Sequence, residues 1–205
     1  MTLWVTVDEF KAQYKDIDGA TDDAFIALAL QASQDVIEGP GRGIGRVVLA
    51  DTDTTKYFDA NGDSVDGADL WVSDQGDLSS ITTLTNGDAE VLTINTHFTG
   101  YPRTLTQNEP SYMRLRMLSS ASKTWTYTTD PENAISITGK WGMWSTVSTV
   151  PDVFKVSAME LAAFTMETRK SQVFDTVAIP DAGVITVPNG FPVTVTNRIM
   201  GWKRL

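Results

Sequence analysis

The chain has 205 residues, of which 41% are hydrophobic and 20% charged, a composition typical of a globular protein with one sizeable core. It has no cysteine, which excludes a disulfide framework, a thiolate metal site and a cysteine nucleophile. The net charge is −10, with −13 in residues 1–100 and +3 in residues 101–205, so ordinary DNA binding is disfavoured and no phosphate track is expected. No apolar run is long enough to span a membrane, and the stretch Phe25 to Leu30 has only six residues.

Two helices are predicted at the start of the chain. Thr6 and Glu9 have the spacing of a capping box and predict a short helix over about 7–15. A second helix is predicted over 22–38 and ends at the glycine-rich "GPGRGIG", 39–45. Its core-facing residues are expected to be those that recur at helical spacing, namely Phe25, Leu28, Ala32 and Val36, with Ile26, Ala29 and Ile37 beside them.

From 46 to 148 the pattern is that of short strands. The predicted strands are 46–50, 55–59, 68–73, 78–84, 89–94, 112–118, 123–128 and 134–140. "TNGD", 85–88, predicts a two-residue hairpin turn. In "YMRLRML", Met113, Leu115 and Met117 are expected on one face of a strand, and Arg114 and Arg116 on the other. This spacing favours a small antiparallel sandwich or barrel.

A long helix is predicted over about 152–171, after Pro151. Its residues Phe154, Ala158 and Leu161 should pack on the helix at 22–38. One further strand is predicted at 183–187, before an extended tail. The predicted fold is therefore α+β, a small helical bundle of N- and C-terminal helices with an inserted antiparallel β domain. The predicted domains are 1–45, 46–148 and 149–205, with 1–45 and 149–190 packed as one helical base.

The stretch "YFDANGDSVDG", 57–67, has several side chains with oxygen atoms at close spacing, as calcium-binding loops do. Asp59, Asn61 and Asp63 match the first three ligand positions of an EF-hand loop, but the glycine at position six and the glutamate at position twelve are missing. We therefore interpret the stretch as a polar hairpin turn between flanking strands, with a weak cation site as the alternative, and expect no bound metal.

No catalytic or cofactor motif is found. "GPGRGIG" follows a helix and lacks the Lys-Ser/Thr of a phosphate loop. His97 has no nucleophile motif around it, and Asp74 and Asp77 flank a turn. The sequence thus predicts no enzyme activity and no cofactor.

Two segments are candidates for contact with partners. Arg103, Arg114 and Arg116 form either a solvated strand face or a contact face for an acidic partner. The C-terminal segment, about 191–205, combines apolar and basic side chains, as interface hot spots do. Its candidate docking residues are Ile199, Met200, Trp202, Lys203 and Arg204. The segment is expected to order on assembly, and the alternative is that Trp202 folds back onto the helices of its own subunit.

As an ordered series these phrases resemble the head–tail connector (adaptor) proteins of tailed bacteriophages. The phrases, in chain order, are "TVDEFKAQY", "TDDAFIALALQASQDVIE", "GRGIGR", "YFDANGDS", "LSSITTLTNGD", "ISITGKWGMW", "VPDVFKVSAMELAAF" and "FPVTVTNRIMGWKRL". The region 88–130 and the segment 172–190 depart from the family pattern.

The resemblance implies a structural virion protein, made in the host cytoplasm and located at the neck. Such a protein forms a ring, usually of twelve subunits, under the portal protein, joins it to the stopper or tail-completion protein, and lines the channel through which DNA passes without specific binding. The alternative is a β-sandwich module that binds carbohydrate or calcium. Trp71 and Trp125 lie within predicted strands, which indicates burial and argues against this alternative.

Overall fold

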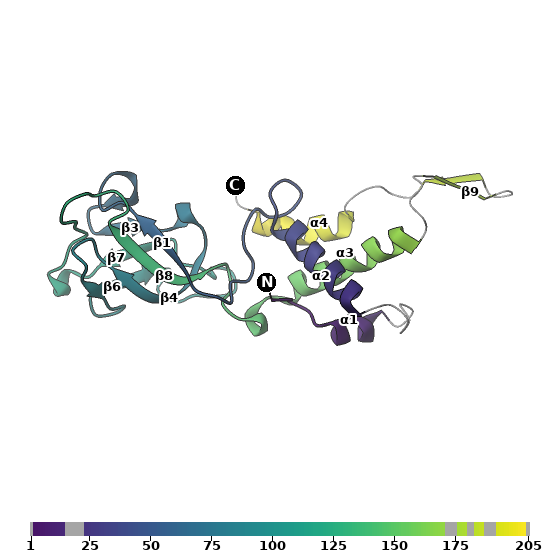
Figure 1. Cartoon of the computed structure of the whole chain (residues 1–205), viewed down its shortest axis with the longest axis horizontal. Coiled ribbons are helices and arrows are strands. Elements are labelled where there is room, and N and C mark those ends of the chain that lie inside the picture. The colour runs from purple at the N-terminus through teal and green to yellow at the C-terminus, as the bar shows by residue number, and fades with distance from the viewer. Residues whose placement is uncertain (1, 15–22, 171–175, 180–182, 187–191, 204–205) are drawn as a thin grey trace. The chain divides into compact units, whose positions relative to one another are not determined.

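The computed structural model describes residues 2–14, 23–170, 176–179, 183–186 and 192–203, and it divides into two compact units (Figure 1). The helical unit comprises residues 1–45 and 151–205, and the β unit comprises residues 46–150. Helices and antiparallel sheets are both present, so the α+β fold class is confirmed.

The helical unit is built on two long helices that pack against each other. Its elements are α1 (Val7–Gln13), α2 (Asp23–Glu38), α3 (Asp152–Lys170), α4 (Val193–Ile199), a 3-10 turn at Met200–Trp202, and the antiparallel pair β9 (Thr176–Ile179) and β10 (Gly183–Thr186). α2 packs against α3, and α3 also contacts α4 (Figure 1). Phe154, Ala158 and Leu161 of α3 are buried, as predicted.

Local polar contacts fix the N-terminal part of this unit. The Glu9 amide donates to the Thr6 hydroxyl, and the Glu9 carboxylate accepts from the Thr6 amide at 2.7 Å, which confirms the capping box. The buried side chain of Gln34 on α2 accepts from the Trp4 amide and donates to the Thr2 carbonyl. These bonds attach the first residues of the chain to α2.

The β unit consists of two four-stranded antiparallel sheets. The first, in spatial order, is β1 (Thr54–Phe58), β8 (Ile135–Trp141), β4 (Leu78–Thr85) and β5 (Val91–Leu92). The second is β2 (Val65–Asp66), β3 (Asp69–Trp71), β7 (Arg114–Met117) and β6 (Phe98–Tyr101). Inward residues of both sheets form one buried cluster, which includes Phe58, Leu70, Leu84, Phe98, Leu115, Ile137 and Trp141. The cluster is the shared core that a sandwich requires.

Two predicted strands are absent, and three strands among the described residues were missed: β2, β6 and β9. Segment 46–50 makes only a single bridge, Leu49 to Trp144, and segment 123–128 only a bridge from Tyr127 to Gly87. Trp125 is buried nonetheless, with its indole N–H donating to the Ala68 carbonyl at 2.9 Å. β6 was missed because Gly100 weakens the strand pattern; a Cβ there would lie 2.4 Å from the Tyr112 ring, so the close approach requires glycine.

The two predicted turns also differ from the structure. β1 pairs with β8 in one sheet and β3 lies in the other, so 57–67 is a crossing between sheets and not a hairpin turn. The short hairpin within this region is β2–β3, which turns at Gly67. β4 and β5 do form a hairpin, but Thr85 pairs with Val91, which makes the loop longer than the predicted two residues.

No helix among the described residues is long and apolar enough to cross a membrane.

Candidate functional site

α2 carries an apolar row that we call the α2 stripe: Phe25, Leu28, Ala32 and Val36, of which Phe25 is half-buried and the other three are exposed. Leu28 is 64% exposed and Val36 is 43% exposed. The prediction that these residues face the core is wrong for Leu28, Ala32 and Val36, which are exposed. It is confirmed for Ile26, Ala29 and Ile37, which were expected beside them and are buried together with Leu30. The apolar side chains of α2 extend around more of the helix than the rest of the helical unit buries. An exposed row of this kind is typical of a contact surface between proteins.

The C-terminal segment is helical and packed over residues 193–202, so the prediction of an extended tail is wrong there. Val195 and Ile199 are fully buried, one helical turn apart, and Thr194 and Arg198 both bond to Glu160 on α3. The Trp202 ring lies 5.6 Å from the Phe154 ring, and Lys203 donates to the Gly41 carbonyl at 2.9 Å.

These contacts match the alternative in which Trp202 folds back onto its own subunit. The physical reason is the spacing of Val195 and Ile199, which gives a short amphipathic helix an apolar side to bury. Met200 is 50% exposed, while Arg204 lies outside the described residues. Docking of the portal protein by this segment, through Ile199, Met200, Trp202, Lys203 and Arg204, stays a prediction.

The three arginines lie on or beside the second sheet of the β unit. Its register places Arg116 between Asp69 and Thr99, and Arg114 between Trp71 and Tyr101. The Arg114 guanidinium bonds to Asp69 at 2.9 Å and lies 4.7 Å from the centre of the Tyr101 ring. We call this set, with Arg103 beside Tyr101, the arginine face.

Two aromatic side chains, Tyr101 and Trp71, lie against arginines of this face. The Arg103 guanidinium beside the Tyr101 hydroxyl lowers the pKa of that tyrosine below its usual value. Trp71, expected to be buried, is only half-buried, because the sheet exposes its face to Arg114, which lies over the ring at 5.6 Å. Sequence reasoning missed Asp69 and Tyr101, and no short-range pattern could have found them, because they join Arg114 only through strand pairing.

Asp77, His97 and Asp59, which were considered as catalytic or metal-binding residues, form hydrogen bonds with other parts of the β unit. Asp77 accepts two bonds from Arg46, at 2.9 and 2.6 Å, and one from Ser111 at 2.8 Å. His97 accepts the Thr93 amide at Nδ1, and Asp59 accepts the Asn133 amide. Over the described residues no group of three His, Asp or Glu side chains could hold a metal. The expectation that 59–63 binds no calcium stays a prediction.

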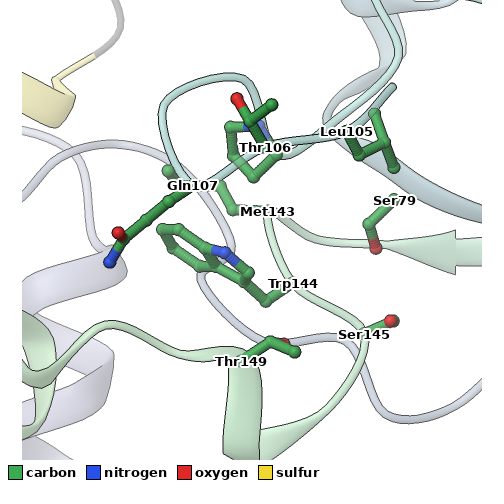
Figure 2. A pocket seen from close by; sticks show the side chains of 9 residues that line it. Ser79, Leu105, Thr106, Gln107, Met143, Trp144, Ser145 and Thr149 are labelled. Carbon is green, nitrogen blue, oxygen red and sulfur yellow. The ribbon is translucent and has the colours of Figure 1, made fainter. Parts of the chain in front are cut away.

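The β unit also contains a pocket of about 370 Å³ under the loop that follows β6. Figure 2 shows the Trp144 indole with loop residues Thr106 and Gln107 on one side and Ser145 and Thr149 on the other. Leu105 and Met143 add apolar lining. None of the lining side chains is ionisable, so the pocket offers no group for acid–base chemistry.

Comparisons with known proteins gave structural matches alone. No protein-family profile and no curated protein matches the sequence. One similar solved structure is a chain from the neck of an empty gene transfer agent particle computed with C6 symmetry, with a TM-score of 0.54 and 15% identity over 98% of this chain and 90% of that chain. Another is a chain from the virion of a native gene transfer agent particle, with a TM-score of 0.55 and 16% identity over 98% of this chain and 90% of that chain. At this identity the likeness shows a shared fold.

Proposed function

We propose that this protein is a structural, non-enzymatic component of the neck of a phage-like particle. The observation that carries the proposal is the match to a neck chain along 98% of this chain, which includes the helical unit and the β unit together. A fold alone supports many functions. Here the near-complete coverage of both chains and the ordered series of adaptor-like sequence phrases point to the same role.

In this role copies of the chain assemble into a ring between the portal and the stopper or tail-completion protein. The α2 stripe supports self-assembly, because it leaves Leu28 and Val36 exposed on a helix whose other side is the core of the helical unit. The neck that contains the similar chain was computed with C6 symmetry, which a ring of twelve subunits satisfies. We assign the α2 stripe to the contact between neighbouring copies.

DNA passes through the proposed ring without being held. A net charge of −10 suits such a channel, since clustered basic side chains would bind phosphates and release their counterions. The arginine face is therefore expected to point away from the channel, towards protein.

Complementation of particles that lack the chain tests this proposal. Leu28→Asp places a charge in the α2 stripe and should abolish the joining of heads to tails. Val91→Asp, at an apolar position of β5 that is 58% exposed and outside the helical unit, is the matched control and should restore joining. Normal tailed particles made without the chain, or with Leu28→Asp at wild-type yield and infectivity, would contradict the ring role.

A further inference from the structure

The arginine face contains a second pocket, of about 330 Å³, whose cations come from separate segments of the β unit. We call it the arginine pocket; its lining includes Thr99, Tyr101, Arg103, Arg116, Ser119 and Lys123. Arg103 follows β6, Arg116 lies on β7, and Lys123 follows the 3-10 turn at Ser119–Ala121. The fold of the β unit thus gathers three cations around one cavity, in a chain whose net charge is −10.

Arg114 does not belong to this pocket but supports it. Its guanidinium is bonded to Asp69 at 2.9 Å and lies against the rings of Trp71 and Tyr101 at 5.6 and 4.7 Å. Its side chain is 30% exposed, against 48% for Arg116. Arg114 therefore acts as a positioning residue that holds the Tyr101 ring and the Asp69 carboxylate in place.

The carboxylates on this face do not neutralise all of its cations. Arg116 lies 3.5 Å from the same Asp69 oxygen that Arg114 bonds at 2.9 Å, so the two arginines share one carboxylate. Lys123 is paired with Glu90 at 2.6 Å. Arg103 is exposed and contacts the Tyr101 ring and hydroxyl. An added anion between Arg103 and Arg116 would relieve the repulsion between them.

We propose that the arginine pocket binds carboxylate side chains of an acidic segment of another protein. Arginine forks bind carboxylates in a bidentate manner, and the Tyr101 ring beside Arg103 reduces the freedom that this side chain loses on binding. The hydroxyls of Thr99 and Ser119 line the same cavity and can donate further bonds to a carboxylate.

A protein acid fits this pocket better than a nucleic acid does. Nucleic-acid affinity comes from many phosphate contacts along an extended track, whereas these cations surround one cavity. The net charge of −10 also repels a long polyanion, while a short acidic segment meets the pocket within about 8–10 Å, the screening length at physiological salt. The proposal does not depend on ring formation or on a place in a neck.

Fluorescence anisotropy with a labelled octaglutamate peptide tests the proposal on the full chain. We expect saturable binding that weakens about tenfold or more in Arg103→Gln and in Arg116→Gln, as for the loss of a charge-assisted hydrogen bond. Arg42→Gln removes the same charge from an exposed site in the helical unit and is the matched control, expected to leave the affinity unchanged. Thermal melting would verify that all three variants keep the fold.

Three results would overturn the proposal. They are absence of peptide binding in low salt, an equal loss of affinity in Arg42→Gln, and tighter, Arg103-dependent binding of an octanucleotide than of the peptide. The last would assign the pocket to nucleic acid. Because the peptide assay uses the isolated chain, none of these results bears on whether the chain is a neck protein.

Discussion

Asn86 joins two segments of the β unit through its side-chain amide. It is 2% exposed, donates to the Thr124 carbonyl at 3.1 Å and accepts from the Thr126 amide at 3.3 Å. A Cβ on the neighbouring Gly87 would lie 2.2 Å from the Thr126 carbonyl oxygen, so Asn-Gly is used here for close packing and not for a tight turn. The segment 123–128 thus bonds to a side chain where a strand partner was predicted.

Removal of this amide should be costly. Asn86→Ala leaves the Thr124 carbonyl and the Thr126 amide without these partners, and we expect a loss of about 1–3 kcal/mol in the free energy of unfolding. Asn61→Ala, at an exposed position, is the control and should change the free energy by less than about 0.5 kcal/mol. Urea unfolding measures both; equal effects would show that the Asn86 bonds do not stabilise the fold.

The Glu9 carboxylate is expected to make the stability of the fold depend on pH. Hydrogen bonds from the Thr6 amide and hydroxyl lower the pKa of the Glu9 carboxyl below its usual 4.5. The folded state therefore binds this proton more weakly than the unfolded chain. The stabilisation is fully present above about pH 4.5 and is lost as the pH falls through the folded pKa.

Comparison with Glu9→Gln tests this sign. Glutamine can still reach back to the Thr6 amide but carries no charge. We expect the wild type to be the more stable at pH 7 and the difference to shrink below about pH 4.5. Thermal melting from pH 7 to pH 3 measures it, and a difference that stays constant or grows in acid would contradict the assignment.

At the scale of elements, local signals predicted α1, α2 and α3 well, missed α4 and predicted the strands unevenly. The capping box, Pro151 and the glycine-rich stop act within one or two turns, so they set the ends of α1, α2 and α3 from nearby residues alone. β6 and the crossing at 57–67 depend on partners far along the chain, such as Tyr112 for Gly100 and β8 for β1. The sequence also did not predict which side of α2 faces the core. Apolar residues lie on more of the helix surface than α3 and its neighbours bury.

Matched leucine substitutions on α2 and α3 separate core from surface. Leu161 is 6% exposed, and Leu161→Ala should lower the free energy of unfolding by about 2–5 kcal/mol. Leu28 is 64% exposed, and Leu28→Ala should cost less than about 0.5 kcal/mol in dilute monomer. Chemical denaturation of both variants verifies this; a large loss for Leu28→Ala alone would mean that the α2 stripe is part of the core.

At the scale of the whole molecule, the two units carry different proposed contact surfaces. The helical unit carries the α2 stripe and the packed C-terminal segment, and the β unit carries the arginine pocket. The arginine residues were named from the sequence, but the pocket was not, because Lys123 and Thr99 join them only through the fold. The α2 stripe was recognised in the sequence as an apolar row, but it was expected in the core, whereas Leu28, Ala32 and Val36 are exposed.

The central claim is that this chain forms the ring of a phage-like neck. Electron cryomicroscopy of particles from the phage or element that encodes it tests this most directly. We predict a ring of this fold between the head and the tail, with the α2 stripe between neighbouring subunits and the arginine face directed away from the DNA channel. Particles with a complete neck that lacks this chain, or a ring whose channel is lined by Arg103, Arg114 and Arg116, would contradict the account.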